Sequence, residues 1–307
     1  MHSELISILI PTYNAQMYIE ELMVALQKQQ LENNQNIEII VVDSTSHDDT
    51  VKILKEKFPK VHVYIIDNHT FDHGGTRNYL ASLAKGEYLL FMTQDAIPAD
   101  DLLVKNLLEG FNKSSKIAIS YARQLPKADA SELEDFARKF NYPHNSQLKN
   151  NEVIRNLGIK TFFNSNVCSM YKKDVFTKLE GFPQKLILNE DMVFASKVIT
   201  SGGDVYYNAD AKVYHSHNYT VKQQFKRYFD IGMAFEQTAF LLKYTSNEKE
   251  GFRMIREQIK YIFSIKKIYL LLKIVIENMA KFVGYNLGKK HYLIPLKYKK
   301  KISAYMK

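Results

Sequence analysis

The sequence has a single cysteine, Cys168, in 307 residues, and it has no low-complexity tract. One cysteine cannot form a disulfide within the chain, and this composition suits a reducing compartment. The first residues, MHSELISILIPTYN, lack a basic region followed by a sustained apolar run, so they do not have the pattern of a signal peptide. From these absences we expect a globular protein of the cytosol.

A run of about 20 uninterrupted apolar residues, as a membrane-spanning helix needs, is also missing. The most apolar helical stretch, 261–283, is interrupted by charged residues, namely Lys266, Lys267, Lys273, Glu277 and Lys281. Two interpretations stay open: a helix that lies in the membrane interface, or a helix packed on the protein with a solvated lysine face. The basic sequence KKHYLIPLKYKKK that follows favours the membrane interface.

Acidic residues are scarce near one end of the chain. Residues 253–307 hold 14 Lys and Arg against two acids, a net charge of +12, and the whole chain has +9, so residues 1–252 have −3. A basic segment predicts an anionic partner, either nucleic acid or a membrane surface. Because its lysines are interleaved with Leu and Ile and form no groove-reading motif, we expect the membrane and no nucleic acid.

Strand and helix patterns alternate over the first 120 residues. They predict strands at 5–10, 37–42, 61–66, 87–92 and 117–122, and helices at 17–30, 48–58, 75–84 and 99–111. This alternation predicts an α/β fold with a mostly parallel central sheet flanked by helices, and ligands at the carboxyl ends of the strands. No Gly-x-Gly-x-x-Gly motif follows the first strand, which argues against a Rossmann dehydrogenase.

The pattern loosens between 123 and 159, where we expect an insertion on the substrate side. A strand, a helix and a strand pair are predicted after it, at 164–171, 191–203 and 204–217. The chain then becomes helical. We therefore divide it into an α/β region, 1–220, and a basic amphipathic helical region, 221–307, that associates with a membrane surface and adds a C-terminal helical extension to the fold.

Polar and charged groups fall where such a sheet binds its ligands. They are Asp43, the DHGGTRN turn (72–78), Asp95, the NED group (189–191) and the HSH group (215–217). Each has an ordinary structural explanation when taken singly, such as a helix cap for Asp43 or Asn189. Their order along the chain makes a shared site the better interpretation.

Together these motifs resemble the inverting glycosyltransferases of family 2, which have the GT-A fold for nucleotide-diphosphate-sugar donors. The matching segments lie within 5–220 and are SILIPTYN, IIVVDSTSHDDT, GGTRNYLASLAKGEYLLFMTQDAIP, GFPQKLILNEDMVFASKVITSGG and VYHSH. The FDHGGTRN and TQDAIP forms look like the bacterial rhamnosyltransferase branch, which builds capsule, O-antigen or rhamnan chains from dTDP-L-rhamnose. A family 2 transferase with a UDP-hexose donor is the alternative.

The resemblance implies a donor site and a metal site. Asp95 matches the second acid of the family's Asp-x-Asp element, and Thr93 stands in place of the first acid. Asp43 keeps the position that contacts the nucleotide base in the family. A divalent cation, Mn²⁺ or Mg²⁺, held by Asp95 with His217 or His215 would neutralise the diphosphate leaving group. The expected donor-nucleotide contacts are Pro11, Tyr13, Asp43, His73, Gly74, Gly75, Arg77, Gln94 and Asp95, with the two glycines letting the backbone approach the ligand.

The resemblance also places the catalytic base on Asp191, with Glu190 as the adjacent rival. Capping of the helix by Asn189 is compatible with this role. Contacts to the acceptor or the diphosphate are expected from Glu190, Gln224, Arg227 and Tyr228, although the last three equally suit a helix-packing face with a partly buried arginine.

The combined expectation is a cytoplasmic enzyme, peripheral at the inner face of the cell membrane. It would transfer L-rhamnose from dTDP-β-L-rhamnose to a hydroxyl of a lipid-linked saccharide, forming an α-linkage. Its partners would be the dTDP-sugar, the saccharide acceptor and an anionic membrane surface, and a homo-oligomer is compatible with these patterns. The alternative from another class is a non-catalytic nucleic-acid-binding protein that uses the basic segment.

Overall fold

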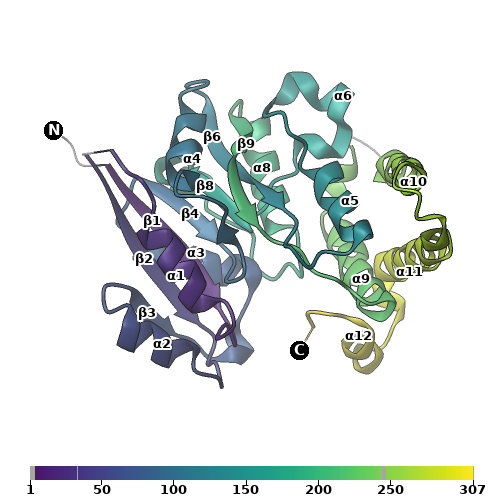
Figure 1. The fold of residues 1–307 in the computed structure, drawn as a ribbon, viewed down its shortest axis with the longest axis horizontal. Coiled ribbons are helices and arrows are strands. Elements are labelled where there is room, and N and C mark those ends of the chain that lie inside the picture. Colours follow the sequence, from purple (N-terminus) through teal and green to yellow (C-terminus); the bar gives the residue numbers. More distant parts are fainter. Residues whose placement is uncertain (1–3, 33, 244–246, 307) are drawn as a thin grey trace.

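The computed structural model describes residues 4–32, 34–243 and 247–306; residues 1–3, 33, 244–246 and 307 fall within the two regions expected from the sequence but lie outside the described part. In the described residues, a nine-stranded mixed sheet has helices on both faces and a group of helices at one side (Figure 1). The strands are β1 (Glu4–Thr12), β2 (Gln35–Asp43), β3 (His62–Ile65), β4 (Tyr88–Met92), β5 (Ile97–Pro98), β6 (Ile117–Leu125), β7 (Gln147–Lys149), β8 (Cys168–Lys172) and β9 (Asp204–Tyr214). The helices are α1 (Ile19–Gln27), α2 (Thr50–Lys57), α3 (His73–Leu83), α4 (Leu103–Phe111), α5 (Glu132–Asn141), α6 (Ile154–Leu157), α7 (Lys173–Lys178), α8 (Glu190–Thr200), α9 (Val221–Gln237), α10 (Asn247–Ser264), α11 (Leu271–Lys289) and α12 (Leu296–Ile302).

The strand directions bring several strand ends to one edge of the sheet. β1 to β4 run parallel in the order β3-β2-β1-β4. β8 lies antiparallel between β4 and β6, and β9 is parallel to β6, so β6 and β9 point the same way as β4. The carboxyl ends of β1, β2, β3, β4, β6 and β9 therefore meet at the same edge, where open α/β sheets bind their ligands.

Two hydrophobic clusters cover the two faces of the sheet. Successive side chains of a strand point to opposite faces. In β1, Ile8 and Ile10 pack with residues of α1 and α4, whereas Leu9 packs in the other cluster with residues of α3 and α8. Burial on both faces explains why the central strands read as continuous apolar runs and not as alternating ones.

The predicted alternation of strands and helices is confirmed, with one correction. The segment 204–217 is not a strand pair: β9 is a single strand that pairs in parallel with β6 along both of its halves. The pairing register shifts between Ala122, which pairs with Asn208, and Arg123, which pairs with Lys212, so that residues 209–211 form an irregularity within the strand. The Asn208 side chain accepts a hydrogen bond from the backbone N–H of Asp210, a local interaction typical of turns.

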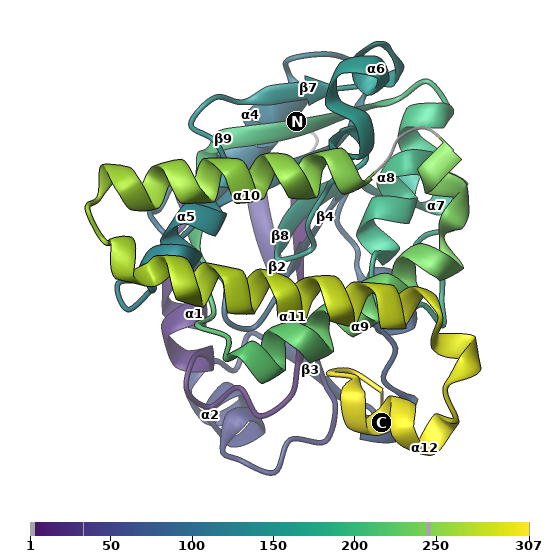
Figure 2. The same cartoon turned by 90° about the vertical axis from the view of Figure 1, so that its right-hand side faces the viewer.

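Helices α9 and α11 pack with their backbones in close contact. A Cβ atom on Gly284 would lie 2.4 Å from the Phe225 carbonyl oxygen, and one on Gly288 would lie 2.0 Å from that of Phe229. Two glycines four residues apart lie on the same side of α11, so they set its approach to α9. Figure 2 shows α10 and α11 crossing the same side of the molecule, and α10 also packs on α5.

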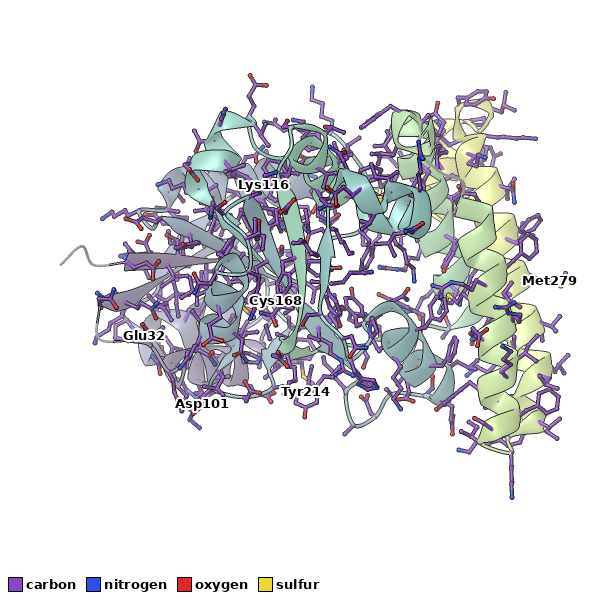
Figure 3. The ribbon with its side chains drawn as sticks, turned by 90° about the horizontal axis from the view of Figure 1, so that it is seen from above. Glu32, Asp101, Lys116, Cys168, Tyr214 and Met279 are labelled. Carbon is purple, nitrogen blue, oxygen red and sulfur yellow. The ribbon has the colours of Figure 1, made fainter. Side chains whose placement is uncertain are left out.

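The apolar stretch predicted at 261–283 has two different sides. It includes the end of α10 and much of α11, which packs on α9 through its glycine side. Its outward side exposes Leu272, Val275, Met279 and Phe282, and Figure 3 shows Met279 pointing away from the sheet. Among the described residues, none of the helices combines the length and the apolarity that crossing a bilayer requires. The stretch therefore packs on the protein and also presents an apolar surface.

Candidate active site

The shared sheet edge brings together groups that lie far apart in the sequence. Asp95 follows β4, Gln124 is near the end of β6, and His215 and His217 follow β9. They line a cavity of about 560 Å³ together with Asp191, which lies in the first turn of α8. The sequence therefore grouped these acids and histidines correctly, and the parallel arrangement of the strands is the reason.

Asp95, His215 and His217 form a compact cluster. The Nε2 atoms of His215 and His217 lie 3.5 and 3.2 Å from Oδ2 of Asp95, and 3.1 Å from each other. Two imidazole nitrogens that face one another repel through their lone pairs unless a proton or a cation lies between them. One carboxylate and two imidazoles suit a divalent ion such as Mn²⁺, so the donor set fits the expected metal.

The ring of His215 is held by a hydrogen-bond chain. Gln124 Oε1 lies 2.9 Å from its Nδ1, and Arg138 Nη1 donates to the same Gln124 oxygen at 2.5 Å. This arrangement places the proton on Nδ1 and leaves Nε2 free as a ligand atom. Burial lowers the pKa of His215 to about 3, so the ring is neutral. Burial raises the pKa of Asp95, but His217 and His215 more than offset this and keep the carboxyl ionised.

Asp191 is fixed at the cavity by the turn that precedes α8. Its Oδ2 accepts the backbone N–H of Asn166 at 3.1 Å. Asn189 occupies the N-cap position with φ 71°, a left-handed conformation that asparagine tolerates. Its side chain makes no capping hydrogen bond, so the predicted cap is wrong, although Glu190 and Asp191 do lie in the first turn, where acids are favoured.

Glu190 and Asp191 have different surroundings. Glu190 is buried 3.2 Å from Arg77 Nη1 and accepts a hydrogen bond from Asn166. Burial alone would raise the pKa of Glu190, but Arg77 and His73 lower it below its usual value. Burial and then the charge of Glu190 raise the pKa of Asp191 to about 7. Of the two, Asp191 is thus the carboxyl that can take up a proton near neutral pH.

The segment predicted to contact the diphosphate or the acceptor does face the cavity. Gln224, Arg227 and Tyr228, all on α9, line it. Arg227 Nη1 donates a hydrogen bond to the Tyr305 hydroxyl at 2.6 Å, and the Tyr305 ring lies edge-on to His73 with 5.6 Å between centroids. Arg77, which is buried, and Arg227, which is half-buried, give this part of the cavity two guanidinium groups.

Asp43 and its neighbours lie further along the same edge. The Asp43 carboxylate is fully buried and accepts hydrogen bonds from Thr12 Oγ1 at 2.8 Å and from the Ser46 backbone and hydroxyl at 2.8 and 2.6 Å. It therefore joins the ends of β1 and β2 and does not cap a helix. Gln94 bonds the backbone N–H and carbonyl of Tyr13, and Pro11 is half-buried in β1.

Gly74 and Gly75 have an explanation within the protein. A Cβ on Gly74 would lie 2.0 Å from the carbonyl oxygen of Pro183, and one on Gly75 would lie 2.9 Å from the Asp72 carboxylate. Asp72 is the N-cap of α3 and accepts the Gly75 backbone N–H. Neither glycine lines the cavity, and the space beside each is taken up by other atoms of the chain, so their donor contact stays a prediction.

Gln124, Arg138, Asn166 and Tyr305 line the cavity and were missed by sequence reasoning. Gln124 lies just past a predicted strand, and its position at the carboxyl end of that strand could have indicated it. Arg138 lies in a segment without a strand signal, Asn166 lies in the predicted strand 164–171 just before the observed β8, and Tyr305 reaches the cavity only because α12 folds back beside α9. Tertiary structure alone brings these residues to the site.

Three comparisons with known proteins agree with this geometry. The sequence model of glycosyl transferase family 2 matches residues 7–180. O-antigen chain rhamnosyltransferases of Salmonella typhimurium and Salmonella anatum are each 38% identical over 293 residues, with 95% and 94% of this chain and 91% of each relative covered.

The solved structures extend the likeness to the fold. A mannosyltransferase from Pyrobaculum calidifontis, in complex with GDP-Man and Mn²⁺, superposes with a TM-score of 0.61 at 14% identity, covering 92% of this chain and 86% of that one. A Staphylococcus aureus structure of TarS residues 1–349 gives 0.56 at 17% identity, covering 94% and 91%. The arrangement of strands and helices is therefore the GT-A one.

Proposed function

The chain belongs to glycosyl transferase family 2, and we propose that it is an inverting rhamnosyltransferase of bacterial cell-surface polysaccharide synthesis. Its substrates would be dTDP-β-L-rhamnose and a hydroxyl of a lipid-linked saccharide. The observation that carries this proposal is the 38% identity, over nearly the full length of both chains, to O-antigen chain rhamnosyltransferases.

Asp191 is the proposed general base. It takes the proton of the acceptor hydroxyl as that oxygen attacks C1 of the rhamnose from the face opposite the diphosphate. The new O–C1 bond forms as the bond from C1 to the β-phosphate oxygen breaks, and the nucleoside diphosphate leaves with the electron pair. The Asn166 N–H orients the Asp191 carboxylate for this transfer. A single displacement of this kind inverts the anomeric centre and yields an α-rhamnoside.

Asp95, His215 and His217 are the proposed metal ligands. A divalent cation bound there would supply positive charge to the leaving diphosphate. The chain's own contribution is to keep Asp95 ionised and His215 neutral, with Nε2 facing the cluster. The hydrogen bond to Gln124 fixes the orientation of the His215 ring as a ligand.

Arg77 and Arg227 are the proposed diphosphate contacts. A guanidinium group can donate two parallel hydrogen bonds to a phosphate, and both arginines line the cavity that holds Asp95. Arg77 is already paired with Glu190, which fixes its position. Tyr13, Asp43 and Gln94 lie beyond the cavity at the ends of β1, β2 and β4, where we place the nucleoside.

We further propose that the basic helical region, 221–307, holds the enzyme at the cytoplasmic face of the membrane. The exposed apolar side chains of α11, such as Leu272 and Phe282, lie among the lysines that give residues 253–307 their net charge of +12. Apolar side chains that enter the lipid boundary and lysines that meet anionic headgroups stabilise the same orientation. A lipid-linked acceptor would be available at this surface.

The test is hydrolysis and transfer with a panel of nucleotide sugars. We expect the purified protein with Mn²⁺ to turn over dTDP-β-L-rhamnose and to leave UDP-glucose, UDP-galactose and UDP-N-acetylglucosamine unchanged. Turnover of a UDP-hexose with none of dTDP-rhamnose would instead support the alternative family 2 activity.

A further inference from the structure

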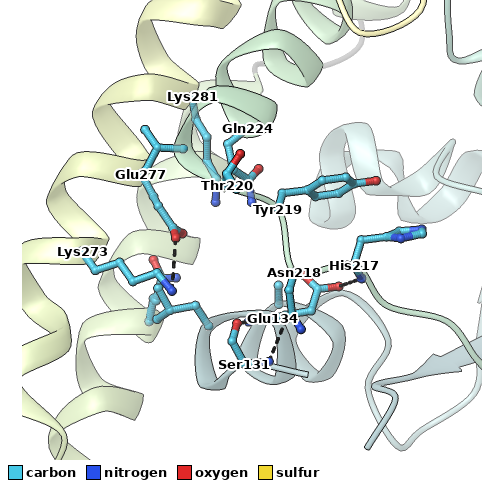
Figure 4. Close-up of a pocket in the computed structure, with 14 residues that line it drawn as sticks. Ser131, Glu134, His217, Asn218, Tyr219, Thr220, Gln224, Lys273, Glu277 and Lys281 are labelled. Carbon is cyan, nitrogen blue, oxygen red and sulfur yellow. Dashed lines mark hydrogen bonds and ion pairs between the residues drawn. The ribbon is translucent and has the colours of Figure 1, made fainter. Parts of the chain in front are cut away.

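A second cavity, of about 320 Å³, adjoins the cavity that contains Asp191 and Asp95. It lies between α5, the start of α9 and the inner side of α11 (Figure 4). His217, Tyr219 and Gln224 line both cavities, so the two are continuous. Its volume is within the range of small-ligand sites.

The side chains of this second cavity suit a neutral, hydroxyl-rich ligand. The lining includes two carboxylates, Glu134 and Glu277, and two amines, Lys273 and Lys281, so the charges of these four side chains balance. A diphosphate would meet two carboxylates here, which disfavours it. Sugar hydroxyls both donate and accept hydrogen bonds, and this mixture of carboxylate, amine, amide and hydroxyl groups can satisfy them.

Glu277 is the most informative residue of the lining. Its side chain is only 7% exposed, although it lies on a helix whose other side faces solvent, and its nearest cation, the Lys273 amine, is 3.8 Å away. That distance is longer than a hydrogen bond. A buried carboxylate is costly unless hydrogen-bond donors surround it, and hydroxyls of a bound sugar would supply them.

The position of the second cavity indicates that it belongs to the acceptor side of the site and not to the donor side. The proposed nucleoside contacts, Asp43 and Tyr13, lie at the ends of β1 and β2, and the Asp95 cluster lies between them and the second cavity. A ligand in the second cavity is therefore beyond the reacting centre as seen from the donor. We propose that it binds the second sugar of the acceptor saccharide, the unit next to the sugar whose hydroxyl reacts.

This inference rests on the proposed transferase activity and adds a subsite to it. Helix α11 connects the subsite with the surface: Lys273, Glu277 and Lys281 repeat every four residues on its inner side, while Leu272 and Met279 are exposed on its outer side. An acceptor saccharide that passes the subsite would thus emerge beside the proposed membrane surface, where its lipid carrier resides.

The experiment compares single sugars with disaccharides as acceptors. Octyl glycosides of common hexoses are tested with dTDP-β-L-rhamnose, and disaccharide glycosides that end in the best hexose follow. We expect the wild type to have a lower KM for the best disaccharide than for its terminal sugar alone. Glu277→Gln and Lys273→Ala should each raise the disaccharide KM about tenfold and so bring the ratio of the two KM values towards one.

Asn286→Ala is the matched control, since Asn286 is exposed on the same helix and does not line the cavity. It should keep the wild-type ratio, and melting curves verify that each variant folds. Lys273 is half exposed, so its variant tests the subsite even if Glu277→Gln unfolds. An unchanged ratio in folded variants overturns the subsite.

Measurements on the wild type distinguish a wrong subsite from a wrong donor. If it turns over another nucleotide sugar and not dTDP-rhamnose, the proposed donor is wrong, and the same KM ratio is measured with the donor that works. If the wild type has the same KM for the disaccharide as for its terminal sugar alone, the subsite is also contradicted, whichever donor is used.

Discussion

Glu190 and Asp191 are neighbours in the sequence, yet their partners move their pKa values in opposite directions. Arg77 and His73 keep the Glu190 carboxyl ionised, and the resulting negative charge adds to burial in raising the pKa of Asp191 to about 7. Two carboxyls whose environments separate their pKa values are typical of acid–base sites. The charge of Glu190 thus helps to give Asp191, the proposed base, its raised pKa.

The pH profile of kcat/KM tests this tuning. A general base must be ionised, so activity should be full above pH 7 and should fall as the pH drops through about 7. Glu190→Gln removes the neighbouring charge and lowers the pKa of Asp191, so the acid limb should shift to lower pH. An acid limb that stays in place in Glu190→Gln would contradict the coupling.

The metal site can be tested at the level of one carboxylate. Asp95→Ala removes the only oxygen ligand of the cluster with His215 and His217, so Mn²⁺ binding measured by electron paramagnetic resonance should weaken at least tenfold. Asp101→Ala, an exposed acid that bonds Gln30, is the control and should bind as the wild type does. Equal Mn²⁺ affinity in Asp95→Ala and in the wild type would disprove the assignment.

At the scale of elements, glycine spacing fixes α11 on α9. A methyl group on Gly288 would lie 2.0 Å from the Phe229 carbonyl oxygen. Gly288→Ala should therefore lower the free energy of unfolding by about 1–3 kcal/mol, as overpacking typically does, measured by urea denaturation.

Gly251 provides the opposite control. It lies in α10, and a Cβ there would have no neighbour within 4 Å. Gly251→Ala should leave stability unchanged or raise it by up to about 1 kcal/mol, since alanine favours a helix. Similar effects of the two substitutions would argue against a glycine-dependent contact between α9 and α11.

The helices and strands also show how much of the fold could be predicted from the sequence. The strand and helix order of the α/β region followed from periodicity, because each element buries its own apolar face. The sequence predicts a strand pair where β9 is a single strand: Asn208 and Asp210 form a local turn-like hydrogen bond, but pairing with β6 resumes at Lys212. Such an irregularity depends on the neighbouring strand, which a local pattern does not contain.

For the whole molecule, the resemblance predicted a shared site for Asp95, Asp191 and the histidines, and the structure places them around one cavity because they lie at the ends of recognisable elements. Arg138 and Tyr305 escaped notice because α5 and α12 reach the cavity only through packing against other helices. Asp43 was placed at the right edge, but its burial among Thr12 and Ser46 depends on the loop conformation.

The uneven charge of the chain predicts membrane binding that depends on salt. Vesicles with phosphatidylglycerol should bind the protein, and neutral phosphatidylcholine vesicles should bind it less. Binding should weaken from about 50 to about 300 mM salt because screening increases. Phe282→Glu should weaken binding in co-sedimentation. Met17→Glu, at an exposed apolar residue before α1, should not. Equal loss in both variants would contradict a surface on α11.

The central proposal is that Asp191 acts as the general base in an inverting transfer of rhamnose. The most direct measurement is nuclear magnetic resonance of the product formed from dTDP-β-L-rhamnose and a saccharide acceptor, with the wild type and with Asp191→Asn. We predict an α-linked rhamnoside from the wild type and a rate at least about 100-fold lower in Asp191→Asn, as expected for loss of a general base. A β-linked product, or a rate that Asp191→Asn leaves unchanged, would contradict the mechanism.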